Sequence, residues 1–187
     1  STSETLFLSD ISGTIIDQII VEKLPPNTSV GISKNSQAVV NFLETTPGSE
    51  NSSNEFLGVV ENEVVFSQEG GLLVSPISLS LSGNNSNEVI RYTRDGSTPL
   101  ETSPIYSNPI QIQENTSVRA QIFSQNYLPS PINTKSFIIG ANHDIDVVLL
   151  TTDSRHFFDQ DTGIYVFGPE GTYDTNIPYY GANFWED

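Results

Sequence analysis

The densest group of residues that could do chemistry lies near position 155. Asp153, Asp159 and Asp161 place three carboxylates close together in the sequence, and Gly163 follows them. Because calcium prefers several oxygen ligands from one loop, these three aspartates form a candidate calcium site. The spacing does not follow the EF-hand pattern, and a chain with 23 acidic residues produces such clusters by chance. The favoured interpretation is a solvated turn in which Asp153 caps a short helix, with calcium as the alternative.

Other catalytic chemistries have little material in this sequence. The only two histidines, His143 and His156, are favoured as surface residues, since a metal pair would require the fold to bring them together. Carboxylate pairs for glycoside hydrolysis can be drawn between many acids, but the loops lack a concentrated tryptophan or tyrosine platform for a sugar ring. With no cysteine, thiolate catalysis and disulfides are excluded. We therefore expect no enzyme activity, no catalytic residue and no cofactor-binding residue in this chain.

Aromatic residues gather near the C-terminus. One interpretation is a stacking surface for glycans or for a protein partner. The favoured one is a segment that packs against a further domain. The residues concerned are Tyr173, Tyr179, Tyr180, Phe184 and Trp185.

Charge and composition restrict the partners. Seven basic residues against 23 acidic ones give a net charge of −16, which opposes binding to nucleic acid or to an anionic membrane. No apolar run approaches the roughly 18 to 20 residues of a membrane-spanning helix. The abundance of serine, threonine and asparagine is typical of extracellular β-proteins. Because the sequence contains no methionine, we expect an excerpt of a longer chain.

The apolar runs are short, rich in Ile, Val, Phe and Tyr, and separated by turn-forming residues, so they predict an all-β chain. One helical turn is expected over 153–159, and a polar linker near 45–54. The predicted strands cover 5–8, 14–21, 38–43, 57–66 with a break at 61–63, 76–82, 88–93, 109–113, 116–124, 133–139, 145–151 and 163–167.

The middle of the chain carries the most specific motif. Residues 91–99 have the sequence Arg-Tyr-Thr-Arg-Asp-Gly-Ser-Thr-Pro. Asp95 and Gly96 predict a tight turn, because glycine adopts a positive φ at little cost, and Pro99 closes the loop. With 103–106, 108–110 and 118–120, this motif resembles the C-terminal domain of chitobiase and β-hexosaminidase-type glycosidases.

That resemblance extends over residues 67–140 and implies an immunoglobulin-like β-sandwich without catalytic residues. In such a sandwich the alternation of each strand decides which side chains are buried. We expect these core residues: Tyr92, Ile110, Val118, Ala120 and Phe123.

The two flanking segments resemble other families. Residues 6–10, 13–17 and 46–51 resemble the second half of a lamin-tail domain, which implies a partial immunoglobulin-like sandwich over 1–55, followed by a linker over 56–66. Residues 146–153, 157–159 and 162–166 resemble the opening of the CotH kinase family, so 141–187 is expected to be the N-terminal segment of such a domain. No catalytic residue of that family can be assigned here.

Together these features predict a non-catalytic structural or adhesive fragment of a large secreted or cell-surface bacterial protein. Two alternatives stay open: the targeting arm of a CotH-type atypical kinase, and a carbohydrate-binding accessory module. The expected partners are other domains or chains of the same surface assembly, or glycans. If both ends lack strands of their domains, apolar residues there should be uncovered. The residues concerned are Ile15, Ile19, Val21, Phe157, Phe158, Tyr179, Tyr180 and Trp185.

Overall fold

The computed structural model describes residues 3–22, 24–140, 146–166 and 168. Nearly all regular structure is β, so the predicted all-β class is confirmed, while the immunoglobulin-like arrangement stays a prediction. The described residues divide into two compact units. Unit 1 holds those within Ser1–Asn62 and Ile122–Pro131, and unit 2 holds those within Glu63–Gln121 and Ile132–Asp187.

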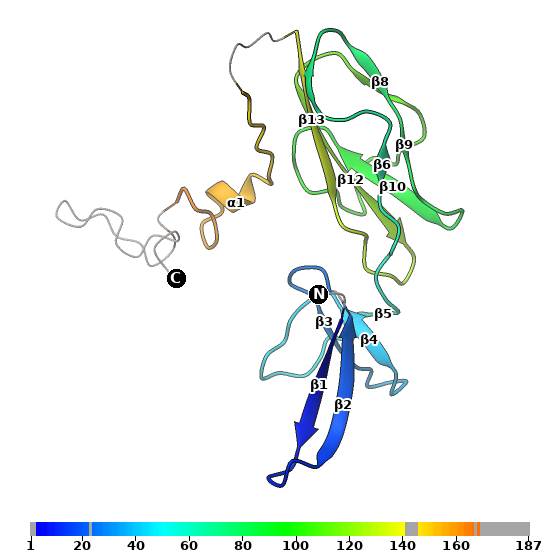
Figure 1. Cartoon of the computed structure of the whole chain (residues 1–187), viewed down its shortest axis with the longest axis vertical. Helices are drawn as coiled ribbons and strands as arrows, with labels where there is room; N and C mark the ends of the chain where they lie inside the picture. Colours follow the sequence, from blue (N-terminus) through cyan, green and yellow to red (C-terminus); the bar gives the residue numbers. More distant parts are fainter. Residues whose placement is uncertain (1–2, 23, 141–145, 167, 169–187) are drawn as a thin grey trace, which may run out of the picture. The chain divides into compact units, whose positions relative to one another are not determined.

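Unit 1 begins with a long hairpin, drawn in blue in Figure 1. Strands β1 (Ser3–Ser9) and β2 (Ile15–Glu22) pair antiparallel and form a two-stranded sheet. In the turn, Asp10 Oδ1 accepts the backbone N–H of Ser12 and that of Thr14, each at 2.9 Å, and Gly13 adopts a φ of 86°. The Ser12 hydroxyl and these N–H groups hold the pKa of Asp10 below its usual range.

A second sheet of unit 1 contains β3 (Ser29–Ile32), β4 (Val39–Phe42) and β5 (Glu55–Phe56), in that order. The segment expected as a linker, 56–66, begins in β5, and the Val60 N–H donates to the carbonyl oxygen of Leu128 at 2.9 Å. Apolar side chains from the sheet and from both chain segments make up the core of this unit. They are Val40, Phe42, Val60, Ile122, Phe123 and Leu128.

The main sheet of unit 2 has the strand order β10, β12, β13, β7, and Figure 1 shows the first three side by side. These strands are β10 (Glu88–Thr93), β12 (Thr116–Ser124), β13 (Asn133–Ile139) and β7 (Gly71–Leu73). β12 and β13 run antiparallel, whereas β13 and β7 run parallel. The last residues of β12 belong to unit 1.

Two strand pairs complete unit 2. Strand β8 (Ile77–Leu79) pairs with β11 (Ile110–Ile112), and β6 (Val65–Phe66) pairs with β9 (Leu81–Ser82), both antiparallel. Buried side chains from these pairs and from the main sheet form the core: Val64, Leu79, Leu81, Ile90, Ile110, Ile112, Val118, Ala120 and Phe137.

The predicted core residues are buried with one exception. Ile110, Val118, Ala120 and Phe123 are all less than 9% exposed. Val118 and Ala120 follow the alternation of β12, whereas Phe123 departs from it beside the buried Ile122 and belongs to unit 1. Tyr92 is only half-buried, so its placement in the core was wrong. Its ring lies edge-on to that of Tyr106, with centroids 6.5 Å apart, near the border of the sheet.

The C-terminal part contains the predicted helical turn, α1 (Arg155–Phe158). The strands predicted over 145–151 and 163–167 do not form in their described parts, 146–151 and 163–166. Val148 and Leu150 there are more than 80% exposed, and no described strand pairs with them. Among the described residues, no helix is long and apolar enough to cross a membrane.

Candidate functional site

The motif of residues 93–99, called the motif loop below, begins where β10 ends. Asp95 Oδ1 accepts the Ser97 backbone N–H at 3.0 Å and the Ser97 hydroxyl at 2.6 Å, which closes the turn. Gly96 adopts a φ of 82°, as predicted from the sequence. The Thr93 hydroxyl donates to the Ser97 carbonyl oxygen at 2.6 Å. These bonds fix the loop locally, and the Ser97 donors lower the pKa of Asp95.

A neighbouring strand secures the motif loop from one side. Arg119, on β12, donates from Nη1 to the Gly96 carbonyl oxygen at 3.0 Å and to the Thr98 hydroxyl at 3.4 Å. Because Arg119 alternates with the buried Val118 and Ala120, its side chain leaves the core and reaches this loop. The main sheet therefore holds the motif loop at the Gly96 carbonyl and at the Thr98 side chain.

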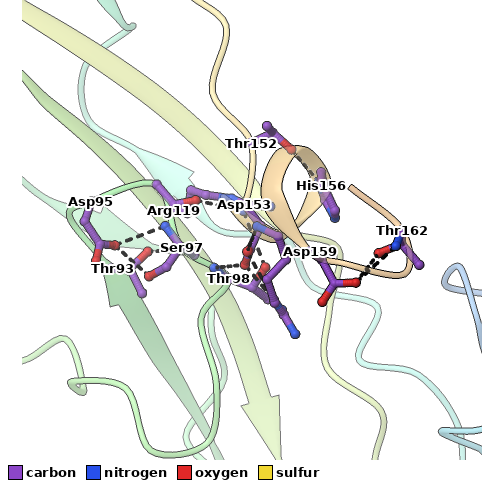
Figure 2. Close-up of polar contacts among 12 residues, drawn as sticks. Thr93, Asp95, Ser97, Thr98, Arg119, Thr152, Asp153, His156, Asp159 and Thr162 are labelled. Carbon is purple, nitrogen blue, oxygen red and sulfur yellow. Dashed lines mark hydrogen bonds and ion pairs between the residues drawn. The ribbon is translucent and has the colours of Figure 1, made fainter. Parts of the chain in front are cut away.

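A carboxylate far away in the sequence binds the same loop. The Thr98 N–H donates to Asp153 Oδ2 at 3.0 Å, across 55 positions of sequence. Asp153 Oδ1 accepts the Arg155 backbone N–H at 3.0 Å and Arg155 Nε at 3.1 Å. Figure 2 shows Asp153 beside Thr98 of the motif loop. We call Thr98, Asp153 and Arg155 the Asp153 cluster.

The electrostatics of this cluster keep Asp153 ionised at neutral pH. The Asp153 side chain is 6% exposed, whereas that of Arg155 is 67% exposed and remains hydrated. The Arg155 guanidinium first, and then the backbone N–H groups, hold the pKa of Asp153 well below its usual range, although burial alone would raise it. A general acid needs a raised pKa, so Asp153 is suited to anchoring rather than to proton transfer.

Hydroxyl groups make a second attachment beside the Asp153 cluster. Thr151 Oγ1 lies 2.6 Å from Ser136 Oγ on β13 and 3.1 Å from Ser117 Oγ on β12, and the two serine oxygens are 2.8 Å apart. Three hydroxyls within hydrogen-bonding distance join two strands to the segment that follows them. Residues 151–155 are thus bound to the sandwich at two places.

The remaining polar residues of this segment bind locally. The Thr152 hydroxyl is hydrogen-bonded to His156 Nδ1. Asp159 Oδ1 accepts the backbone N–H of Asp161 at 3.0 Å and that of Thr162 at 3.1 Å, which lowers the pKa of Asp159. His143 lies outside the described residues.

Two of the three candidate calcium ligands accept hydrogen bonds from protein donors. Asp153 serves the motif loop and Arg155, and Asp159 closes the turn that contains Asp161. Within the described part of the chain, which includes all three aspartates, no three acidic, histidine or cysteine side chains are placed to share a metal ion. Calcium binding stays a prediction of the sequence alone.

The expected N-cap role of Asp153 needs a correction of one residue. Ser154 occupies the N-cap of α1 and makes no side-chain capping bond. Asp153 precedes it and still binds the first helical N–H, that of Arg155. The Asp153 carboxylate therefore binds both the start of α1 and the motif loop. Because Asp153 lies one residue before the N-cap, it can also reach Thr98.

Aromatic rings lie on and after α1. Phe157 and Tyr165 stack with centroids 5.2 Å apart and planes at 24°, and Phe158 lies 6.2 Å from Tyr165. Phe158 is 66% exposed and Tyr165 is 72% exposed, so both side chains are largely open to solvent. The aromatic residues predicted near the C-terminus, Tyr173, Tyr179, Tyr180, Phe184 and Trp185, lie outside the described residues.

Sequence reasoning missed the pairing of Thr98 with Asp153 and the role of Arg119. The role of Arg119 could have been predicted, because the alternation that buries Val118 and Ala120 places Arg119 on the other face of β12. The pairing of Thr98 with Asp153 has no signal in the local sequence, since its donor is a backbone N–H, which every residue except proline has.

Comparison with known proteins agrees with the motif. The profile of the Chitobiase/beta-hexosaminidase C-terminal domain matches residues 68–134, which contain the motif loop and Arg119. No curated protein and no solved structure matches the chain. The resemblances of 1–55 to lamin-tail domains and of 141–187 to the CotH family stay predictions. The family match supports a carbohydrate-associated accessory module in the middle of the chain.

Proposed function

We propose that this chain is a non-catalytic structural module of a larger secreted or cell-surface bacterial protein, in which the sandwich holds the segment after it in a fixed position. The Asp153 cluster carries this proposal. A buried, ionised carboxylate with donors from the motif loop and from α1 provides directional attachment. An attachment of this kind is what a spacer or display module needs at its junction with the next segment.

The same residues support a non-catalytic role for this segment. Asp153 and Asp159 both have lowered pKa values and accept hydrogen bonds from neighbouring donors, so neither is prepared to act as a general acid. The alternative of a targeting arm for a CotH-type kinase agrees with a non-catalytic chain, since the chemistry would belong to another part of the parent protein.

We therefore expect the purified chain to transfer no phosphate from ATP and to cleave no chitin oligosaccharide. Radiolabelled ATP with general acceptor proteins, and chromogenic N-acetylglucosaminides, would measure the two activities, with the heat-inactivated chain as control. An activity that co-purifies with the chain and disappears on heating would overturn the proposal of a non-catalytic module.

Carbohydrate binding is a second candidate, and the exposed rings of Phe158 and Tyr165 favour it. Sugar rings stack on exposed aromatic faces, and nearby carboxylates and amides bind their hydroxyls. The high negative charge of the chain would favour a neutral glycan over an anionic one.

If a glycan stacks on these rings, Tyr165→Ala should weaken retention on a chitin column by about tenfold or more, because a central aromatic contact contributes more than 1 kcal/mol to binding. Tyr127→Ala is the matched control, since Tyr127 is a 40% exposed tyrosine of unit 1. Equal retention of both variants, or no retention of the parent chain, would count against this candidate.

A further inference from the structure

The β1–β2 hairpin has uncovered apolar residues on both faces. Leu6, Phe7 and Leu8 on β1 are 57%, 58% and 60% exposed, and Ile16 and Ile20 on β2 are 65% and 62% exposed. The predicted exposure of Ile15 is also found, at 56%, whereas Ile19 and Val21 are half-buried. An isolated two-stranded hairpin is only marginally stable in water, and a third strand with apolar contacts stabilises it.

Neither strand of the hairpin has a second partner among the described residues, because β1 and β2 pair only with each other. Proteins usually protect a free edge with lysine, proline or a short strand. β1 is seven residues long, contains neither lysine nor proline, and carries one ionisable residue, Glu4. Its outer edge is therefore open to strand addition.

The apolar residues of β1 are also self-complementary when two copies of the strand pair antiparallel. We propose that the β1 edges of two copies of this chain pair antiparallel about a two-fold axis at Phe7. This register places Phe7 opposite Phe7 and Leu6 opposite Leu8 on both sides of the axis. Directly opposed residues of an antiparallel pair project to the same face, so all three pairs are apolar contacts.

The alternation of β1 makes it the better edge for this pairing. Leu6 and Leu8 project to one face and Phe7 to the other, so pairing along β1 covers apolar surface on both faces. In β2, Asp17 and Gln18 interrupt the apolar residues at the middle of the strand. The product would be a four-stranded antiparallel sheet with the order β2, β1, β1, β2.

The negative charge of the chain causes long-range repulsion between two copies, and salt should screen this repulsion. Two copies each carry a net charge of −16. Screening shortens the reach of that repulsion from about 30 Å at 0.01 M salt to about 8 Å at 0.15 M. The dimer should therefore become stronger as sodium chloride is added. An edge-to-edge contact of this size forms a weak, concentration-dependent dimer.

Sedimentation velocity on the full 187-residue chain tests the state of association. The parent chain should shift from monomer to dimer as its concentration rises, more so at high salt, and Phe7→Lys should weaken the dimer by about tenfold or more because it places two charges at the axis. We expect even a weak interface of this kind to have a Kd no higher than about 1 mM. A chain that stays monomeric up to that concentration in 0.15 M salt would overturn the proposal.

Cross-linking tests the register without depending on how Phe7→Lys folds. The sequence contains no cysteine. A single introduced cysteine can therefore form a disulfide only with the same cysteine of a second copy. Phe7→Cys should form a disulfide-linked dimer about tenfold faster than Ile11→Cys, because pairing raises the effective concentration at the axis. Ile11 lies in the hairpin turn and is fully exposed, which makes it the matched control. Equal rates, or an oligomer that Phe7→Cys does not trap, would overturn the β1 pairing.

Discussion

Replacing Asp153 with alanine is expected to release residues 153–158 from the motif loop, while Thr151 stays bound to Ser117 and Ser136 and the two units stay folded. The Thr98 N–H would lose its acceptor, and Arg155 would lose three hydrogen bonds to the carboxylate. An unsatisfied partly buried donor costs about 1–3 kcal/mol. Since Arg155 is mostly hydrated, the loss at Thr98 should dominate the effect.

Trypsin offers a direct measurement of this release. Arg155 is the last lysine or arginine of the sequence, so cleavage there separates 156–187 from the rest. When opening is fast relative to cleavage, the rate follows the population of the open form. A loss of 1–3 kcal/mol then corresponds to cleavage about 5- to 150-fold faster.

Two variants make this measurement specific. Asp153→Asn keeps an oxygen for the Thr98 N–H but removes the charge, so its cleavage rate should lie between those of the parent and of Asp153→Ala. Asp161→Asn is the matched control, because Asp161 is exposed and lies in the same segment. A peptide of residues 146–166 with each substitution corrects for the preference of trypsin itself. Parent-like cleavage of Asp153→Ala would mean that the cluster does not hold the segment.

The cluster should also depend on pH in a defined direction. The pKa of Asp153 is lower in the folded chain than the value of about 3.9 usual for an unfolded aspartate. Its contribution to stability is therefore complete above the unfolded pKa and declines as the pH falls below about 3.9 toward the folded pKa. Hydrogen exchange of 151–158 at pH 7 and pH 3 should show the parent approaching Asp153→Asn at the lower pH. A constant difference between them would contradict this linkage.

The local features of the motif were predictable because their causes are local. Asp95 and Gly96 form a turn through bonds to Ser97 and a positive φ, all within three residues. The long strands β10, β12 and β13 were predicted at their observed bounds, since each is rich in β-branched and aromatic residues.

The failures have equally physical causes. Residues 146–151 have the apolar composition of a strand, but a strand also needs a partner for its backbone groups, and composition does not show whether one exists. Strands β3 and β7 contain glycine and were missed, because glycine lowers the strand signal while the sheet around it supplies the pairing. The partnership of Thr98 with Asp153 depends on tertiary structure, and no pattern in the sequence encodes it.

Gly96 links the local turn to the anchored segment. Its φ of 82° is strained for any residue with a Cβ, most of all a β-branched one. A Cβ built there would lie 3.3 Å from Thr151 Cγ2, in the segment that the Asp153 cluster holds. Substitution therefore acts on the turn and on the attachment together.

Gly96→Val should destabilise unit 2 by about 1–3 kcal/mol through the forced left-handed conformation alone. Asparagine tolerates this conformation, so Gly96→Asn should cost much less although it has the same Cβ. Comparing the two separates backbone strain from crowding against Thr151. Hydrogen exchange in increasing urea, read at the amides of β12 and β13, measures the change within unit 2, and β3 and β4 of unit 1 serve as the internal control. If Gly96→Val and Gly96→Asn lost equal stability, crowding would be the cause. If neither variant lost stability, the glycine turn would not be the feature that fixes the motif loop beside Asp153.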